Sequence, residues 1–251
     1  MSKKTIVTLI LAGVASLSTY AQKEMVTVHG VVTDFNNNPI DSVKVSLKSK
    51  SFKDLYTTTT GKDGKYTLKV PKGRYYCLYA INLAHYGKTK LEYWAWNVPA
   101  FEDMEINPQY ERMELYGLNV FEPQVGPFET YMVYFRPMSL TKANKGYKGT
   151  KSEVEQKAAA KKDTIDIAPS TISPNELKAF INDREVKVIQ VQRVVEYGRG
   201  GYIFSYIAQI QKNKNEEKLS KTDKITLILH SKETNEYGRA ECYYEKPEYP
   251  N

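Results

Sequence analysis

The chain has 251 residues, 41% hydrophobic and 26% charged, and this balance excludes an intrinsically disordered protein. Its formal net charge is +7, or +5 without Lys3 and Lys4, which lie in an N-terminal segment that we expect to be removed. This charge is spread along the chain and does not favour nucleic-acid binding, which needs a focused basic face. Twenty tyrosines against eight phenylalanines and two tryptophans favour pleated, half-exposed β-structure.

Residues 1–21 have the features of a secretory signal peptide: a positive start, an apolar stretch from Ile6 to Leu17, and a small-x-small cleavage site at 19–21. The apolar stretch is shorter than the roughly 20 residues that span a membrane, which favours cleavage over the alternative of an uncleaved anchor. We expect the mature chain to begin at Gln22. We also expect export to the periplasm or cell surface of a Gram-negative bacterium, with no membrane-spanning segment after cleavage.

Short strands separated by turns are predicted from residue 25 to residue 98. Val43, Val45 and Leu47 alternate with polar residues, and this period of two is typical of a strand with one buried face. Turn residues rich in Asn, Gly and Pro follow at 36–39, 61–64 and 71–73. This spacing indicates an antiparallel β-sandwich with strands at 26–33, 43–48, 55–60, 65–70, 74–82 and 88–97.

The same stretch resembles the carboxypeptidase regulatory-like domain family. The resemblance rests on Gly30-Val31-Val32-Thr33-Asp34, Pro39-Ile40, Thr60-Gly61-Lys62-Asp63-Gly64-Lys65-Tyr66 and Pro71-x-Gly73-x-Tyr75. Gly61 departs from the family pattern, in which Asp is commoner. The resemblance covers about 75 residues and implies a transthyretin-like seven-stranded sandwich without a reaction, because the family's domain is an accessory module.

The second half is predicted to form another sandwich. Strand patterns recur at 113–121, 130–138, 177–182, 186–197, 202–211, 224–231 and 239–245, with turns at 182–183 and 234–238. We expect a regulatory-like domain at 22–100 and an immunoglobulin-like sandwich at 104–247. The alternative is a smaller second sandwich starting near Ile165, with the preceding strands joined to the first domain. The predicted fold class is all-β, with two antiparallel β-sandwich domains.

A lysine-rich stretch at 141–163 lacks an apolar period and is predicted to be a mobile insertion, with a frayed helical turn around 152–160. Its seven lysines outnumber its three acidic residues. This composition favours a solubilising loop. The alternative is a loop that attracts an anionic envelope polymer, such as lipopolysaccharide or an acidic glycan.

Catalytic and metal chemistry have little support in the sequence. His230 and Glu233 have a His-x-x-Glu spacing, but no histidine follows them to complete a zinc site, and His29 and His85 are isolated. No nucleophile elbow, phosphate-binding glycine loop or Cys-x-x-Cys pair occurs. We therefore predict no catalytic residue, no metal site and no cofactor, in a protein that is not an enzyme.

The two cysteines, Cys77 and Cys242, lie far apart in the chain, which excludes a disulfide-rich scaffold. Each falls in a strand-like stretch, where a free thiol is usually a small buried apolar group. A bridge between the two domains is the alternative.

The aromatic residues of two neighbouring strands form the candidate ligand-binding set. Trp94 and Trp96 are two residues apart and so lie on one face of a strand, while Tyr75 and Tyr79 occupy the preceding strand with Tyr76. Exposed indole rings would form a platform on which a sugar stacks. The interpretation that we favour is that they fill the core or the seam between the domains, because burying each side chain there stabilises by about 2–3 kcal/mol.

Together these features predict a non-catalytic cell-envelope protein that acts as a structural or protein-interaction module. The alternative is a carbohydrate-binding module that presents glycans to separate enzymes. The expected partner is an envelope protein or an extracellular polysaccharide, and not a nucleic acid.

Overall fold

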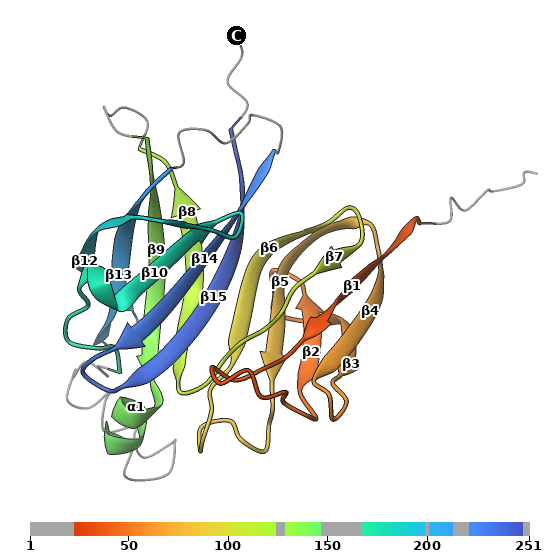
Figure 1. Cartoon of the computed structure of the whole chain (residues 1–251), viewed down its shortest axis with the longest axis horizontal. Coiled ribbons are helices and arrows are strands. Elements are labelled where there is room, and N and C mark those ends of the chain that lie inside the picture. The colour runs from red at the N-terminus through yellow and green to blue at the C-terminus, as the bar shows by residue number, and fades with distance from the viewer. Residues whose placement is uncertain (1–22, 124–128, 147–166, 199–200, 213–220, 248–251) are drawn as a thin grey trace, which may run out of the picture.

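The computed structural model describes residues 23–123, 129–146, 167–198, 201–212 and 221–247, and nearly every regular element in it is a β-strand. Two β-sandwiches lie side by side, with β6 and β15 at their junction (Figure 1). The predicted all-β sandwich architecture is confirmed.

The first sandwich packs a sheet of order β4-β1-β7 against strands of order β6-β5-β2-β3. Alternation drives this packing, because Tyr66, Leu68 and Val70 of β4 (Lys65–Pro71) are buried and the residues between them are exposed. The remaining strands are β1 (Met25–Val31), β2 (Lys44–Lys48), β3 (Asp54–Thr59), β5 (Gly73–Ile81), β6 (Tyr93–Ala100) and β7 (Met104–Glu105).

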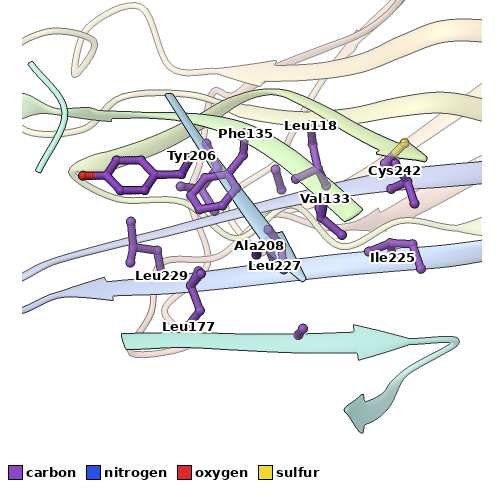
Figure 2. Close-up of a cluster of buried hydrophobic side chains, with 14 of the residues drawn as sticks. Leu118, Val133, Phe135, Leu177, Tyr206, Ala208, Ile225, Leu227, Leu229 and Cys242 are labelled. Atoms are coloured by element: carbon purple, nitrogen blue, oxygen red, sulfur yellow. The ribbon is translucent and has the colours of Figure 1, made fainter. Parts of the chain in front are cut away.

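The second sandwich packs a sheet of order β12-β13-β9-β8 against strands of order β11-β10-β14-β15. Figure 2 shows its interior, where Phe135 and Tyr206 of one sheet face Leu177 and Leu229 of the other. The strands are β8 (Met113–Phe121), β9 (Thr130–Ser139), β10 (Leu177–Ile181), β11 (Arg184–Val186), β12 (Val188–Gly198), β13 (Gly201–Gln211), β14 (Thr222–Ser231) and β15 (Glu236–Glu245). A helix α1 (Leu140–Gly146) follows β9, and a 3-10 turn (Pro174–Glu176) precedes β10.

One eight-stranded sheet runs through both sandwiches, because β6 and β15 pair in parallel. Successive residues of β6 enter different cores: Trp94 and Trp96 pack with the second sandwich, and Tyr93 and Ala95 with the first. Since successive side chains of a strand point to opposite faces, the two smaller sheets cover opposite faces of the shared sheet.

The strand pairings divide the chain near residue 112. β7 pairs with β1 of the first sandwich, whereas β9, the partner of β8, pairs with β13 of the second. We therefore propose that the domain boundary lies between β7 and β8, somewhat later than the interval at 100–104 expected from the sequence.

Several predicted strands differ at their ends. The strand predicted at 186–197 divides at Lys187, so that β11 and β12 belong to different sheets. The strand predicted at 88–97 begins only at Tyr93, because turns that include Gly87 at φ +71° precede it. The turn predicted at 234–238 ends before Glu236, because Glu236 already belongs to β15 and pairs with Ser231 of β14.

The start of the predicted insertion is helical. Ser139 caps α1, its hydroxyl oxygen accepting a hydrogen bond from the backbone N–H of Lys142 at 3.1 Å. The rest of the insertion, at 147–163, lies outside the described residues, and so does its predicted helical turn. The predicted signal peptide at 1–21 and the expected mature N-terminus, Gln22, lie outside them as well.

Candidate functional site

The two tryptophans lie stacked inside the protein. Their ring centroids are 5.1 Å apart and their planes differ by 13°. Trp94 is only 6% exposed and Trp96 only 5%, so neither indole offers a face to a ligand. The exposure that a sugar platform requires is not met, and the indoles fill the junction between the sandwiches.

Four further aromatic rings surround the indoles, and we call the six residues the seam cluster. Tyr116 comes from β8 of the second sandwich and meets both indoles edge-on, at 5.3 and 5.4 Å. Tyr79 contacts Trp94 at 4.4 Å, and Tyr76 contacts Trp96 at 5.6 Å. The sixth member, Phe52, is described next.

Phe52 covers the outer side of the seam cluster. Its centroid lies 6.0 Å from that of Trp94 and 6.5 Å from that of Trp96, with the rings nearly perpendicular. It adopts φ +60° in the loop between β2 and β3, and its side chain remains partly exposed. A bulky residue in this left-handed region is held there by its surroundings, here the contact with the indoles.

Tyr75 does not join the other candidate residues. Its ring lies on the opposite face of β5, in the core of the first sandwich, and meets Tyr56 edge-on at 5.8 Å. Its hydroxyl donates a hydrogen bond to the carbonyl oxygen of Pro71 at 2.6 Å. The structure therefore brings together Trp94, Trp96 and Tyr79, and separates Tyr75 from them.

Two acidic residues beside the seam cluster were missed in the sequence analysis. The Trp94 indole N–H donates to Glu114 at 2.8 Å, and the Tyr79 hydroxyl donates to Glu92 at 2.6 Å. Burial raises the pKa of both carboxyl groups, and the neighbouring Glu92 raises that of Glu114 further. The available signal was an acid at an apolar strand position, since Glu114 stands between Met113 and Leu115.

Paired charges border the seam cluster on the side of the first sandwich. Asp54 accepts hydrogen bonds from Lys44 at 2.6 Å and from Lys48 at 2.5 Å. Burial opposes ionisation of Asp54, but these hydrogen bonds lower its pKa overall. The Lys48 ammonium also lies 4.5 Å from the centroid of the Tyr79 ring, a cation–π contact.

A second charged group borders the cluster on the side of the second sandwich. Arg136 of β9 lies 5.5 Å from the centroid of Tyr116 and pairs with Glu196 of β12 at 2.7 Å. Burial opposes ionisation of Glu196, while hydrogen bonds from Arg136 and Tyr134 lower its pKa overall. The seam cluster is thus an aromatic interior framed by cations that already have partners.

The two cysteines are buried free thiols. Both are in register with Trp96, Cys77 from β5 and Cys242 from β15, so that β6 separates them. The Cα atoms of the two cysteines are therefore two strand spacings apart, each of roughly 5 Å. This distance exceeds the Cα separation of about 7 Å that a disulfide can bridge. Burial raises the pKa of each thiol to about 12, which makes both poor nucleophiles.

The histidines have ordinary surroundings. His29 and His85 are exposed, and His230 stacks on Tyr237 at 3.9 Å. Glu233 binds the backbone N–H of Ser170 rather than converging on His230. Within the described ranges, no group of three or more His, Cys, Asp or Glu side chains is arranged to hold a metal ion.

Residues 27–80 match the carboxypeptidase regulatory-like domain family. The predicted resemblance is confirmed over these residues. The matched segment therefore supplies Phe52, Tyr76 and Tyr79 of the seam cluster, and the indoles lie beyond it. No curated protein matches the chain.

Solved structures show only a distant likeness. The major pilin subunit BcpA of Bacillus cereus is 13% identical, with 87% of this chain and 67% of that chain covered and a TM-score of 0.27. A DUF3823 family protein from Parabacteroides merdae is 9% identical, with 89% and 100% covered and a TM-score of 0.28. The major pilin SpaD of Corynebacterium diphtheriae is 10% identical, with 88% and 64% covered and a TM-score of 0.22. Such scores support no conclusion about function.

Proposed function

We propose that this protein is an exported, non-catalytic component of the cell envelope that acts as a structural or protein-interaction module. The match to a regulatory-like domain over residues 27–80 supports this proposal, because that family's domain is an accessory module. The use of the most aromatic segment for internal packing supports it too, since the indoles join the sandwiches and do not line a binding surface.

The hairpin of β12 and β13 is the observation that carries the proposal. β12 is the outer strand of its sheet, and within the described residues β9 pairs only with 206–211 of β13, so the half of the hairpin nearer the tip has no pairing with β9. Ile189 and Val195 are exposed on β12, and Tyr197 at the tip is 85% exposed. The unpaired edge of an outer strand is a template for pairing with another chain. We therefore assign to β12 a partner protein that adds an extended segment.

Site-specific photo-crosslinking in cells tests this surface. A crosslinking residue in place of Tyr197 is expected to give one discrete adduct with an envelope protein. The same residue in place of Thr67, which is exposed on β4, is expected to give none. Equal labelling at both positions, or none at Tyr197, would contradict the proposal. Retention of the purified protein on polysaccharide without any protein adduct would favour the carbohydrate-binding alternative.

Export is a separate part of the proposal. Among the described residues, no helix combines the length and the hydropathy needed to cross a membrane. We expect N-terminal sequencing of the protein from the cell envelope to start at Gln22, because the apolar stretch before it has the length of a cleaved signal. A chain recovered intact from the cytoplasm, with residues 1–21 attached, would overturn this part.

A further inference from the structure

Two buried carboxyl groups, one from each sandwich, meet at the edge of the seam cluster. Glu92 immediately precedes β6 in the first sandwich, and Glu114 lies on β8 in the second. Glu114 is 2% exposed and Glu92 is 8% exposed. Trp94 donates to Glu114 and Tyr79 donates to Glu92, and the centroids of these two donor rings are only 4.4 Å apart. The two carboxyl groups therefore lie close together across the junction between the domains, within reach of a hydrogen bond to each other.

A hydrogen bond between these two groups requires a proton. Each carboxyl already accepts one hydrogen bond, Glu114 from the Trp94 indole at 2.8 Å and Glu92 from the Tyr79 hydroxyl at 2.6 Å. Two ionised carboxylates only accept hydrogen bonds, so a bond between them exists only if one carries a proton. Glu114 is the more buried of the two and is the natural holder of that proton, which it donates to Glu92.

We propose that Glu92 and Glu114 form a shared-proton clasp that locks the two sandwiches together, and that loss of this proton loosens their junction. The clasp goes beyond the proposed function, because it assigns a pH-dependent joint to the fold and does not depend on any partner of β12.

The charges that face the clasp do not replace the proton. Lys48 approaches from β2 but pairs with Asp54, and Arg136 approaches from β9 but pairs with Glu196. Tyr79, Tyr86, Tyr110 and Tyr116 are the other titratable neighbours. Burial, together with the nearby carboxyl groups, raises the pKa of Tyr79 and Tyr86, so both stay neutral when the clasp titrates. Burial likewise raises the pKa of Tyr110 and of Tyr116.

The direction of the pH dependence follows from linkage. Burial raises the pKa of both carboxyl groups above the value of 4.5 expected in the unfolded chain. The folded protein therefore holds more protons than the unfolded chain above that value. The stability contributed by the clasp is fully present below about pH 4.5 and is lost as the pH rises through the folded-state pKa.

Tryptophan fluorescence reports directly on this junction, because the only two tryptophans of the chain are Trp94 and Trp96. For the wild-type protein we expect emission to shift to the red and acrylamide quenching to rise between pH 5 and pH 9.5. Thermal stability is expected to fall over the same range. The full folded chain is used throughout.

Three variants make the test specific. In Glu114→Gln the amide still donates to Glu92 and accepts from Trp94, so we expect the transition to disappear. In Glu92→Gln the neighbouring negative charge is gone, so we expect the midpoint to move down by about one pH unit or more. Glu185→Gln changes an exposed carboxylate on β11 and is expected to titrate like the wild type.

Two results would overturn the clasp. One is a wild-type protein whose fluorescence and melting temperature do not change between pH 5 and pH 9.5. The other is a Glu114→Gln variant that folds and keeps the wild-type transition. If Glu114→Gln fails to fold, an unchanged midpoint in Glu92→Gln overturns the proposal on its own.

Discussion

Single residues set how closely neighbouring segments of the first sandwich approach one another, and Gly30 is the clearest case. A Cβ at this position of β1 would lie 1.9 Å from the carbonyl oxygen of Ile106, which also accepts a hydrogen bond from the Tyr66 hydroxyl at 2.7 Å. The same Cβ would lie 2.9 Å from the side-chain oxygen of Asn107. Because backbone blocks the way, no rotamer change relieves this contact.

We therefore predict that Gly30→Ala lowers the free energy of unfolding by about 3 kcal/mol or more. Gly73→Ala is the matched control, because a Cβ at Gly73 meets nothing within 4 Å; its effect should lie within about 1 kcal/mol of zero. Urea denaturation of the two variants measures the difference. Equal stabilities would mean that β1 and the Ile106 segment are not packed as described.

At the scale of elements, Glu236 ties the β14–β15 hairpin to helix α1. Its buried carboxylate accepts hydrogen bonds from the Ser139 hydroxyl and from the backbone N–H of Thr141 at 3.0 Å, and it pairs with Arg112 at 3.2 Å. A carboxylate at the first turn of a helix satisfies N–H groups that have no partner within the helix.

We predict that Glu236→Ala destabilises the protein by about 3 kcal/mol, because it leaves these buried donors and the guanidinium without their acceptor. Glu185→Ala, on the exposed strand β11, should change stability by less than about 0.5 kcal/mol. Hydrogen exchange should also show faster exchange at Thr141 and Lys142 in Glu236→Ala alone. Unchanged exchange there would refute the tie between hairpin and helix.

At the scale of the whole molecule, the shared sheet should make the two sandwiches unfold as one unit. β15 pairs with both β14 and β6, and the seam cluster packs on the same sheet. Separating the sandwiches would expose a strand edge and two stacked indoles at once, and both are unfavourable in water.

We accordingly predict a single calorimetric transition that coincides with the change in tryptophan fluorescence. Trp96→Ala should cost about 3–5 kcal/mol and lower the whole transition, whereas Tyr202→Ala, at an exposed position of β13, should have little effect. Two separate transitions, of which only one moves in Trp96→Ala, would show that the domains unfold independently.

The sequence by itself determined which segments become strands and where several turns lie. Strand formation depends on residues two apart, and this local alternation is visible without a partner, as in β4 and β9. The turn at Asn182 and Asp183 was equally local, because both residues tolerate the positive φ angles that they adopt. The motifs by which the chain resembles the regulatory-like family are likewise turn residues within one stretch of chain.

Only the tertiary structure decided where the strands go and what their side chains do. The pairing of Trp94 with Ala240 and of Trp96 with Cys242 joins segments that are distant in the sequence, and no local pattern specifies it. That pairing placed the indoles in the seam and not on a sugar-binding platform, and it brought Glu114 from β8 to Glu92. Local alternation assigns a residue to one face of a strand, but the burial of that face depends on which distant sheet covers it.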